Sequence, residues 1–185
     1  MGSSIINLFE RSSSWDHSRI VHFDSLCKRL AIHTHPFRTP LFINSHPFSV
    51  KPLQLPLEPI DFPLVIELTE HKLNDRMVLK EALRLKEMGV SFAIDDFGKG
   101  YFDLAFIMDL QPEYIKIAKE VVLSIKDPKN YRVFSYLVGT CQEFGAKVIT
   151  EGIETEELFE IAFPLSDAFQ GYYFGHPQPN MAKVL

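Results

Sequence analysis

Short apolar runs recur along this chain, and a polar side chain follows each of them. The runs and the polar residues after them are 41–43 with Asn44, 64–66 with Glu67, 92–94 with Asp95 and Asp96, 114–115 with Lys116, 147–150 with Glu151, and 168–169 with Gln170. Buried parallel strands read as apolar runs, and the catalytic groups of α/β barrels stand at the C-terminal ends of several strands. The pattern therefore predicts a parallel sheet with one functional site along its C-terminal edge.

The segments between these runs predict helices. Residues 16–32 carry apolar side chains at helical spacing, and the predicted helices over 75–88 and 128–144 each end at a glycine. Asp127 supplies an N-cap before a first-turn proline, and Thr155 caps a further short helix. Alternation of strand and helix predicts an α/β fold with right-handed crossovers in a parallel sheet.

Length and composition indicate one globular domain. At 185 residues the chain can bury a sizeable core, but it is shorter than the roughly 250 residues typical of a complete eight-stranded barrel. We divide it into an N-terminal helical segment, residues 1–40, and a β/α core, residues 41–185, which holds all the motifs discussed below. The net charge of -5 argues against binding to a nucleic-acid polymer.

The sequence predicts neither export nor membrane insertion. No apolar stretch approaches the roughly 18 residues that would span a bilayer, and the N-terminus lacks a charged region followed by an apolar core. Cys27 and Cys141 are isolated, each within a predicted helix, which favours two buried reduced thiols over a disulfide. We therefore expect a cytoplasmic protein that does not bind a membrane.

The polar residues after the apolar runs indicate phosphodiester chemistry. Carboxylate and amide oxygens are hard ligands that suit Mg²⁺ or Mn²⁺. Two such ions about 3.5–4 Å apart, bridged by a carboxylate such as Asp95, would stabilise the attacking and leaving oxygens of a phosphodiester. Taken alone, Asp95 and Asp96 fit a solvated turn equally well. The equivalent positions of Glu67 and Glu151 favour the site.

Five segments carry a recognisable pattern. They are 67–70 (Glu-Leu-Thr-Glu), 95–101 (Asp-Asp-Phe-Gly-Lys-Gly-Tyr), 116–117 (Lys-Ile), 150–154 (Thr-Glu-Gly-Ile-Glu) and 170–174 (Gln-Gly-Tyr-Tyr-Phe). In type, order and spacing they closely resemble the EAL-domain family, which comprises bacterial phosphodiesterases of and receptors for cyclic di-GMP. The resemblance implies a TIM-like (β/α) barrel that opens cyclic di-GMP to linear pGpG with Mg²⁺ or Mn²⁺.

The resemblance also implies a role for each matching residue. The implied metal ligands are Asn44, Glu67, Asp95 and Asp96. The residues implied to hold or activate the attacking water are Lys116, Glu151 and Gln170. Glu154 resembles the residue that anchors the loop after Asp96. Apart from the resemblance, we expect contacts to the dinucleotide at Lys99, Tyr101, Lys116 and Tyr172, with core packing as the alternative for the two tyrosines.

Three departures from the family pattern suggest a degenerate member. The strand that carries the family's Glu-Ala-Leu motif, with one glutamate metal ligand, has no counterpart in this sequence. Lys99 stands where the family usually has threonine, and Ala118 stands where an aspartate normally follows Lys-Ile. A lysine beside a divalent site competes electrostatically with the metal, and the alanine removes an acidic group. We therefore expect an incomplete EAL-type barrel that lacks the first strand and binds metal weakly or not at all.

Three functions agree with these residues. The chain is a non-hydrolysing cyclic di-GMP receptor or regulatory domain, an active Mg²⁺- or Mn²⁺-dependent cyclic di-GMP phosphodiesterase, or a protein-interaction scaffold that needs no nucleotide. We favour the first, because losing a strand impairs catalysis more directly than it impairs binding. An unpaired sheet edge must be covered, which predicts a protein partner or a homodimer.

Overall fold

The computed structural model describes residues 16–36, 38–45, 61–69, 76–100 and 104–176. Within this part of the chain the strands form one parallel sheet in the order β1-β2-β3-β4-β5-β6. Their bounds are β1 Leu41–Ser45, β2 Leu64–Thr69, β3 Ser91–Phe97, β4 Tyr114–Ile117, β5 Lys147–Thr150 and β6 Ala168–Phe169. Each strand thus pairs with the next one along the chain, as the sequence predicts.

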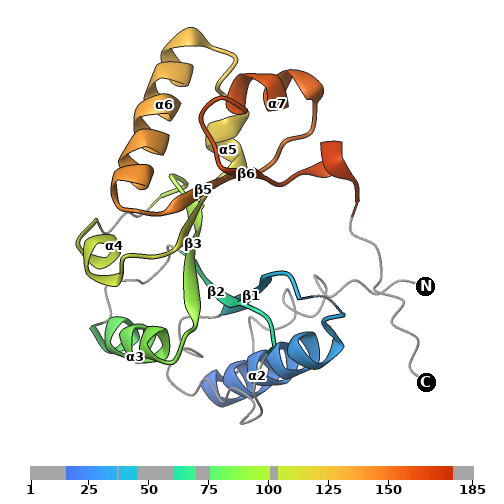
Figure 1. The fold of residues 1–185 in the computed structure, drawn as a ribbon, viewed down its shortest axis with the longest axis vertical. Helices are drawn as coiled ribbons and strands as arrows, with labels where there is room; N and C mark the ends of the chain where they lie inside the picture. Colours follow the sequence, from blue (N-terminus) through green and yellow to red (C-terminus); the bar gives the residue numbers. More distant parts are fainter. Residues whose placement is uncertain (1–15, 37, 46–60, 70–75, 101–103, 177–185) are drawn as a thin grey trace.

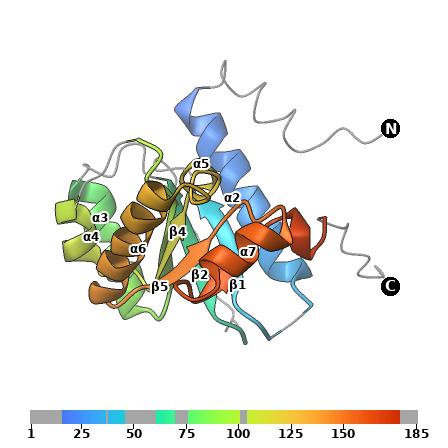
Figure 2. The same cartoon turned by 90° about the horizontal axis from the view of Figure 1, so that it is seen from above.

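The helices lie around the outside of this sheet (Figures 1 and 2). Their bounds are α2 His17–Thr34, α3 Arg76–Glu87, α4 Leu104–Leu110, α5 Lys119–Val122, α6 Pro128–Glu143 and α7 Glu156–Ala162, followed by the 3₁₀ turn η3 Tyr172–Phe174. The N-caps predicted at Asp127 and Thr155 are confirmed, because each side chain accepts a backbone hydrogen bond from the first turn of its helix. Helices α4 and α5 were not predicted from the sequence pattern. Among the described residues, no helix is both long and apolar enough to cross a membrane.

Strands β1 to β4 run further than the apolar runs that predicted them. Asn44, Glu67, Asp95 and Lys116 lie inside β1, β2, β3 and β4, and not after them. A polar side chain can occupy a strand when it points away from the helix layer, since successive side chains alternate between the two faces. The apolar runs of β1 to β4 therefore end two or three residues before their strands, as β3, which extends to Phe97, illustrates, whereas those of β5 and β6 end with their strands.

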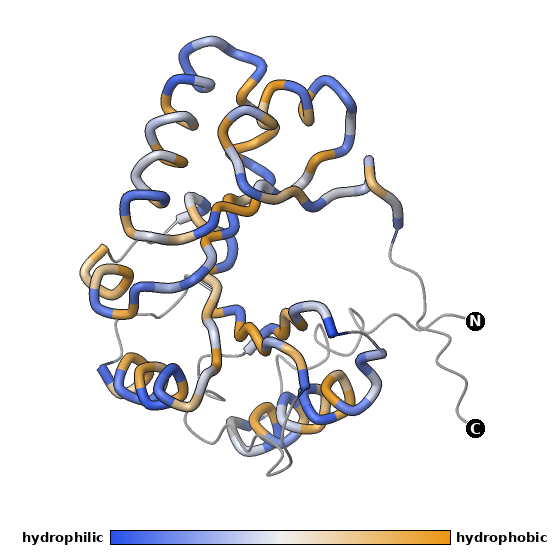
Figure 3. Tube along the Cα trace, in the orientation of Figure 1, coloured by the Kyte–Doolittle hydropathy of each residue, from blue (hydrophilic) through white to orange (hydrophobic). Residues whose placement is uncertain are grey.

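The two faces of the sheet have different roles. One face packs against the helices through the main core, which includes Ile66, Phe92, Ile94, Ile115 and Val148. Alternation places Glu67, Asp95 and Lys116 on the opposite face. Figure 3 shows apolar residues along the strands and an alternation of apolar and polar residues along the helices.

The sheet curves strongly toward this second face. The rings of Phe42 in β1 and Tyr114 in β4 meet edge to face with centroids 5.0 Å apart. Neighbouring strands are about 4.8 Å apart, so a flat sheet would hold side chains from β1 and β4 roughly 14 Å apart. The described strands do not close, since β1 and β6 each pair with a single neighbour. This confirms the predicted architecture of an incomplete barrel.

Candidate functional site

Lys116 stands at the centre of the predicted site. Its ammonium nitrogen Nζ lies 2.8 Å from Glu67 Oε1, 2.8 Å from Asp95 Oδ1 and 2.7 Å from Glu151 Oε1. These partners come from β2, β3 and the residue after β5, so the curvature of the sheet brings together side chains from four strands. The Lys116 and Glu67 side chains are each only 6% exposed. We call these four residues the Lys116 cluster.

Burial and charge act against each other in the Lys116 cluster. Burial would lower the pKa of Lys116, but the negative charges of Glu67, Asp95 and Glu151 outweigh it and raise this pKa above its usual value. Burial raises the pKa of Glu67 and of Glu151 above the usual glutamate range, and the nearby Lys116 offsets only part of that shift. The lysine is therefore firmly protonated and holds the three carboxylates in place.

Asp96 faces a different lysine. It adopts a left-handed backbone conformation with φ 58°, which aspartate tolerates better than most residues. Its Oδ1 lies 3.6 Å from Lys99 Nζ, and the same nitrogen lies 3.2 Å from Glu120 Oε1 on α5. The hydrogen bond to Glu120, and then the charge of Asp96, raise the pKa of Lys99. Two lysines thus contact the carboxylates that the resemblance assigns to metal.

A pocket of about 260 Å³ opens beside the Lys116 cluster, between the ends of β5 and β6. It brings together four residues predicted from the sequence: Glu151, Glu154, Gln170 and Tyr172. It also includes Lys119, the first residue of α5, which the sequence analysis missed. Lys119 forms an ion pair with Glu154. Its position three residues after Lys116 was the signal that could have identified it.

Two glycines shape this pocket. Gly152 has φ 69°, and a β-carbon there would lie 2.4 Å from Lys119 Cγ. Gly171 lies so close to the backbone of Ile153 that a β-carbon would be 2.0 Å from the Ile153 carbonyl oxygen. Ile153 donates its amide hydrogen to the Gln170 carbonyl at 3.1 Å, which fixes β6 against the loop after β5. The Lys119 side chain at Gly152 and the Ile153 backbone at Gly171 therefore position the pocket walls.

The remaining predicted residues lie at the margins or outside the described part. Asn44 is exposed and pairs in register with Glu67, at the same edge as the Lys116 cluster. Glu154 contacts Lys119, and its predicted role as anchor of the loop after Asp96 stays a prediction. Tyr101 lies outside the described residues.

The carboxylate oxygens at this edge are of the type that binds a hard divalent ion, but they are not arranged to hold one. Glu67 and Asp95 supply the carboxylate oxygens that Mg²⁺ and Mn²⁺ prefer. Both direct an oxygen to the Lys116 ammonium, however, and the described residues contain no group of three or more His, Cys, Asp or Glu side chains placed to hold a metal. The metal-ligand role of Asn44, Glu67, Asp95 and Asp96 stays a prediction.

Comparison with known proteins now decides the family. Residues 28–177 match the EAL domain family. The chain belongs to this family. The matched residues include every described strand and the whole Lys116 cluster. The family assignment therefore covers both the sheet and the candidate site.

The EAL relatives with curated names are longer proteins. The probable cyclic di-GMP phosphodiesterase PdeG of Escherichia coli (strain K12) is 35% identical over 121 residues, which are 63% of this chain and 24% of PdeG. The cyclic di-GMP phosphodiesterase NbdA of Pseudomonas aeruginosa is 32% identical over 125 residues, which are 64% of this chain and 16% of NbdA. The chain therefore matches about a quarter or less of the length of these relatives.

Solved EAL structures share the fold. BlrP1 of Klebsiella pneumoniae, in a complex with manganese and cyclic di-GMP at pH 6, superposes with a TM-score of 0.76 and 25% identity over 95% of this chain and 49% of that one. An EAL domain protein of Listeria monocytogenes EGD-e gives 0.72 and 26% over 94% of this chain and 75% of that one. The open parallel sheet described above is therefore part of an EAL-type barrel.

Proposed function

We propose that this chain is a regulatory EAL module that binds cyclic di-GMP without hydrolysing it. The observation that carries the proposal is the position of Lys116 Nζ, within 2.8 Å of carboxylate oxygens from Glu67, Asp95 and Glu151. A divalent ion would need the oxygens of Glu67 and Asp95, which here contact the Lys116 ammonium. The buried ammonium therefore competes with a metal for these ligands, and this supports binding over hydrolysis.

The neighbouring pocket offers groups that suit a dinucleotide. Lys119 can exchange its ion pair with Glu154 for a contact to a phosphate oxygen. Tyr172, 58% exposed at the pocket wall, presents a ring on which a guanine can stack. The Lys116 cluster itself carries three negative charges and one positive charge, so it repels phosphate. We therefore assign the phosphates to the Lys119 side of the pocket and expect moderate, salt-sensitive affinity.

A second candidate is an active phosphodiesterase. The relatives PdeG and NbdA are named as cyclic di-GMP phosphodiesterases, probable in the case of PdeG, and this chain keeps carboxylates at Glu67, Asp95, Asp96 and Glu151. In that case a divalent ion would displace Lys116 from the carboxylates before reaction. Metal would then be required for both binding and turnover.

One experiment separates these functions. Calorimetric titration with cyclic di-GMP is carried out in buffer with Mg²⁺, with Mn²⁺ and with a chelator, and product formation as pGpG is followed in the same samples. The proposal predicts binding in all three buffers and no pGpG above the level of an Asp95→Asn protein. Metal-dependent turnover would establish the phosphodiesterase instead. Absence of binding in every buffer would leave a nucleotide-independent scaffold.

A further inference from the structure

Five aromatic rings gather where α7, β6 and η3 meet (Figure 1). The Phe159 ring is central, and its centroid lies 5.0–5.9 Å from those of the other four. We call this set the aromatic patch; its members are Phe159, Phe163, Phe169, Tyr173 and Phe174. Phe163, Phe174 and Tyr173 are 61%, 53% and 41% exposed. The patch is therefore a contiguous apolar surface of the kind that marks an interaction site.

The chain around the aromatic patch is acidic. Residues 156–176 contain no lysine or arginine, and their acidic residues are Glu156, Glu157, Glu160 and Asp167. Glu156 precedes Phe159 by three positions and Phe163 by seven, so these three residues share one face of α7. Glu160 lies beside them, three positions before Phe163. Both Glu156 and Glu160 are exposed, and neither forms an ion pair with another described residue. Two unpaired carboxylates therefore border the rings.

This combination suits a partner that is both cationic and apolar. Lysine and arginine side chains pair with carboxylates and also stack on the faces of aromatic rings. Two other occupants fit less well. The surface of a membrane is negatively charged, so Glu156 and Glu160 would repel it. A second copy of this chain would bring the same carboxylates face to face, and like charges in an interface oppose association.

We propose that the aromatic patch docks a basic amphipathic segment of another protein. The apolar side chains of the segment cover Phe163 and Phe174, and its lysine or arginine side chains pair with Glu156 and Glu160. The contact adjoins the pocket beside the Lys116 cluster, because Tyr172 lines that pocket and the next two residues of η3 belong to the patch. It also lies at an open edge of the sheet, since β6 pairs only with β5 in the described part of the chain.

A peptide selection tests this proposal. A display library of random peptides is selected on the immobilised full chain and, in parallel, on its Phe163→Ser variant. We expect the full chain alone to enrich sequences that combine several lysine or arginine residues with aliphatic or aromatic ones. The most enriched peptide is then synthesised, and its dissociation constant is measured by fluorescence anisotropy. Phe163→Ser and Glu160→Lys should each weaken binding about tenfold or more, because one removes an apolar contact and the other repels the basic side chains.

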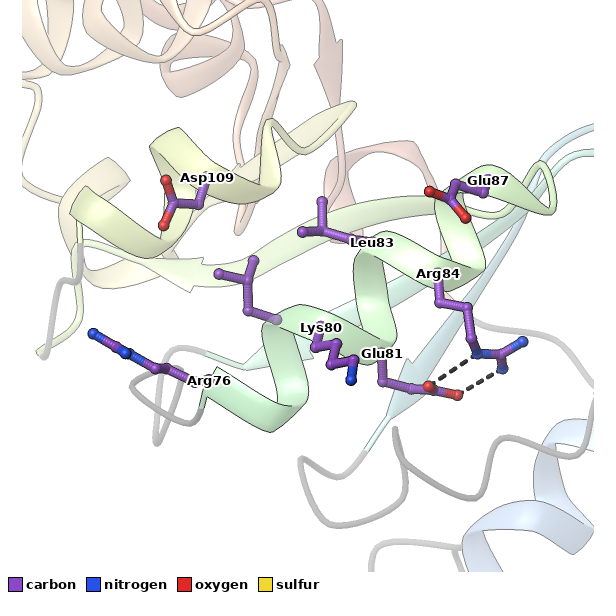
Figure 4. Close-up of a pocket in the computed structure, with 8 residues that line it drawn as sticks. Arg76, Lys80, Glu81, Leu83, Arg84, Glu87 and Asp109 are labelled. Atoms are coloured by element: carbon purple, nitrogen blue, oxygen red, sulfur yellow. Dashed lines mark hydrogen bonds and ion pairs between the residues drawn. The ribbon is translucent and has the colours of Figure 1, made fainter.

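Two matched controls show whether the effects are specific to the aromatic patch. Tyr136→Ser removes an aromatic side chain that is 75% exposed on α6. Glu87→Lys reverses an exposed charge on α3, where Glu87 lines a separate groove of about 660 Å³ (Figure 4). Both should leave the dissociation constant unchanged. Circular dichroism of all four variants checks that they are folded, as expected for substitutions of exposed side chains.

Every other result overturns the proposal. Enriched peptides without basic residues would show that Glu156 and Glu160 do not select the partner. Equal enrichment on the full chain and on Phe163→Ser would place the binding surface elsewhere. Absence of enrichment on either chain would mean that the rings are already covered, by residues 177–185 of this chain or by a second copy.

Discussion

Lys116 and Glu151 join two neighbouring strands at the functional edge of the sheet: Lys116 Nζ lies 2.7 Å from Glu151 Oε1, while the backbone amide of Glu151 donates to the Ile117 carbonyl at 3.1 Å. The backbone bond continues the β4–β5 ladder by one step beyond the end of β5, and the side-chain pair joins the same two strands. The side-chain pair also fixes a carboxylate that would otherwise repel Asp95. The Lys116 cluster is in this sense a structural unit as well as a candidate site.

Removing the central cation should be costly. Lys116→Met leaves three partly or fully buried carboxylates without their counter-charge, and breaking a buried ion pair in this way typically costs about 3–5 kcal/mol. We expect a loss of that size in the free energy of unfolding, measured by urea denaturation. The control is Lys126→Met, which removes the exposed pair with Glu157 and should cost at most about 1 kcal/mol. Equal effects of the two substitutions would contradict the structural role of Lys116.

A second buried lysine attaches α2 to the edge strand β1. Lys28 forms an ion pair with Asp24, both side chains are less than 10% exposed, and Lys28 Nζ also donates to Ser45 Oγ at 2.7 Å. Lys28→Met should lower the free energy of unfolding by about 3–5 kcal/mol, because Asp24 is left buried and uncompensated. The double variant Asp24→Leu/Lys28→Met should recover most of this loss in the same urea measurement. A double variant less stable than Lys28→Met would show that apolar side chains cannot replace the Lys28–Asp24 ion pair at this position.

Substitution by alanine should have opposite effects on stability at Gly171 and at Gly139, because only Gly171 lies close to other atoms. Gly171→Ala places a methyl group 2.0 Å from the Ile153 carbonyl oxygen, so the β6 end must move and the pocket walls separate. Gly139→Ala, inside α6, meets no atom within 4 Å and should raise stability by roughly 0.5–1 kcal/mol through helix propensity. Thermal unfolding should therefore shift downward for the first variant and upward for the second. A neutral Gly171→Ala would show that the contact relaxes easily.

Cys141 should act as a reporter of unfolding. Burial raises the pKa of its thiol to about 12, and its side chain is fully buried in α6. The reactive thiolate is then almost absent at pH 8, since it forms only as the pH approaches the raised pKa. Iodoacetamide at pH 8 should leave Cys141 unmodified in the folded protein and modify it in urea, as measured by peptide mass spectrometry. Rapid labelling of the folded chain would contradict the packing of α6.

Several parts of the fold follow from local sequence, whereas the site depends on curvature. The caps at Asp127 and Thr155 were predictable, because each rests on residues a few positions apart. The order of the strands follows from the alternation of strand and helix, since consecutive parallel strands joined by a helix usually lie side by side. The contact between Lys116 and Glu67 was not predictable, since it joins side chains from strands that are not neighbours. The sequence identified Lys99 as a departure from the family's usual threonine. Its ion pairs with Asp96 and Glu120 could not be predicted, because they depend on the position of α5, and no hydrophobic periodicity indicates that short helix. The buried Lys28–Asp24 pair also looks like an ordinary surface pair in the sequence.

The pocket wall should determine the affinity for cyclic di-GMP. Lys119→Met removes the cation that faces the pocket, and we expect it to weaken binding about tenfold in calorimetric titration, since charge-assisted contacts to phosphate are among the stronger hydrogen bonds. Lys126→Met, which removes another exposed lysine paired with a glutamate, is the matched control and should bind like the wild type.

Salt and chelator then distinguish the source of this affinity. If Lys119 provides the main attraction, raising the salt concentration weakens binding to the wild type more than to Lys119→Met, because an exposed charge is screened. A chelator should change neither protein, because the Lys116 ammonium already contacts the carboxylates of Glu67 and Asp95. Binding that disappears with the chelator and survives Lys119→Met would place the phosphates on a metal at those carboxylates. Lys116 would then be a residue that metal displaces, and the chain would belong with the hydrolytic members of its family.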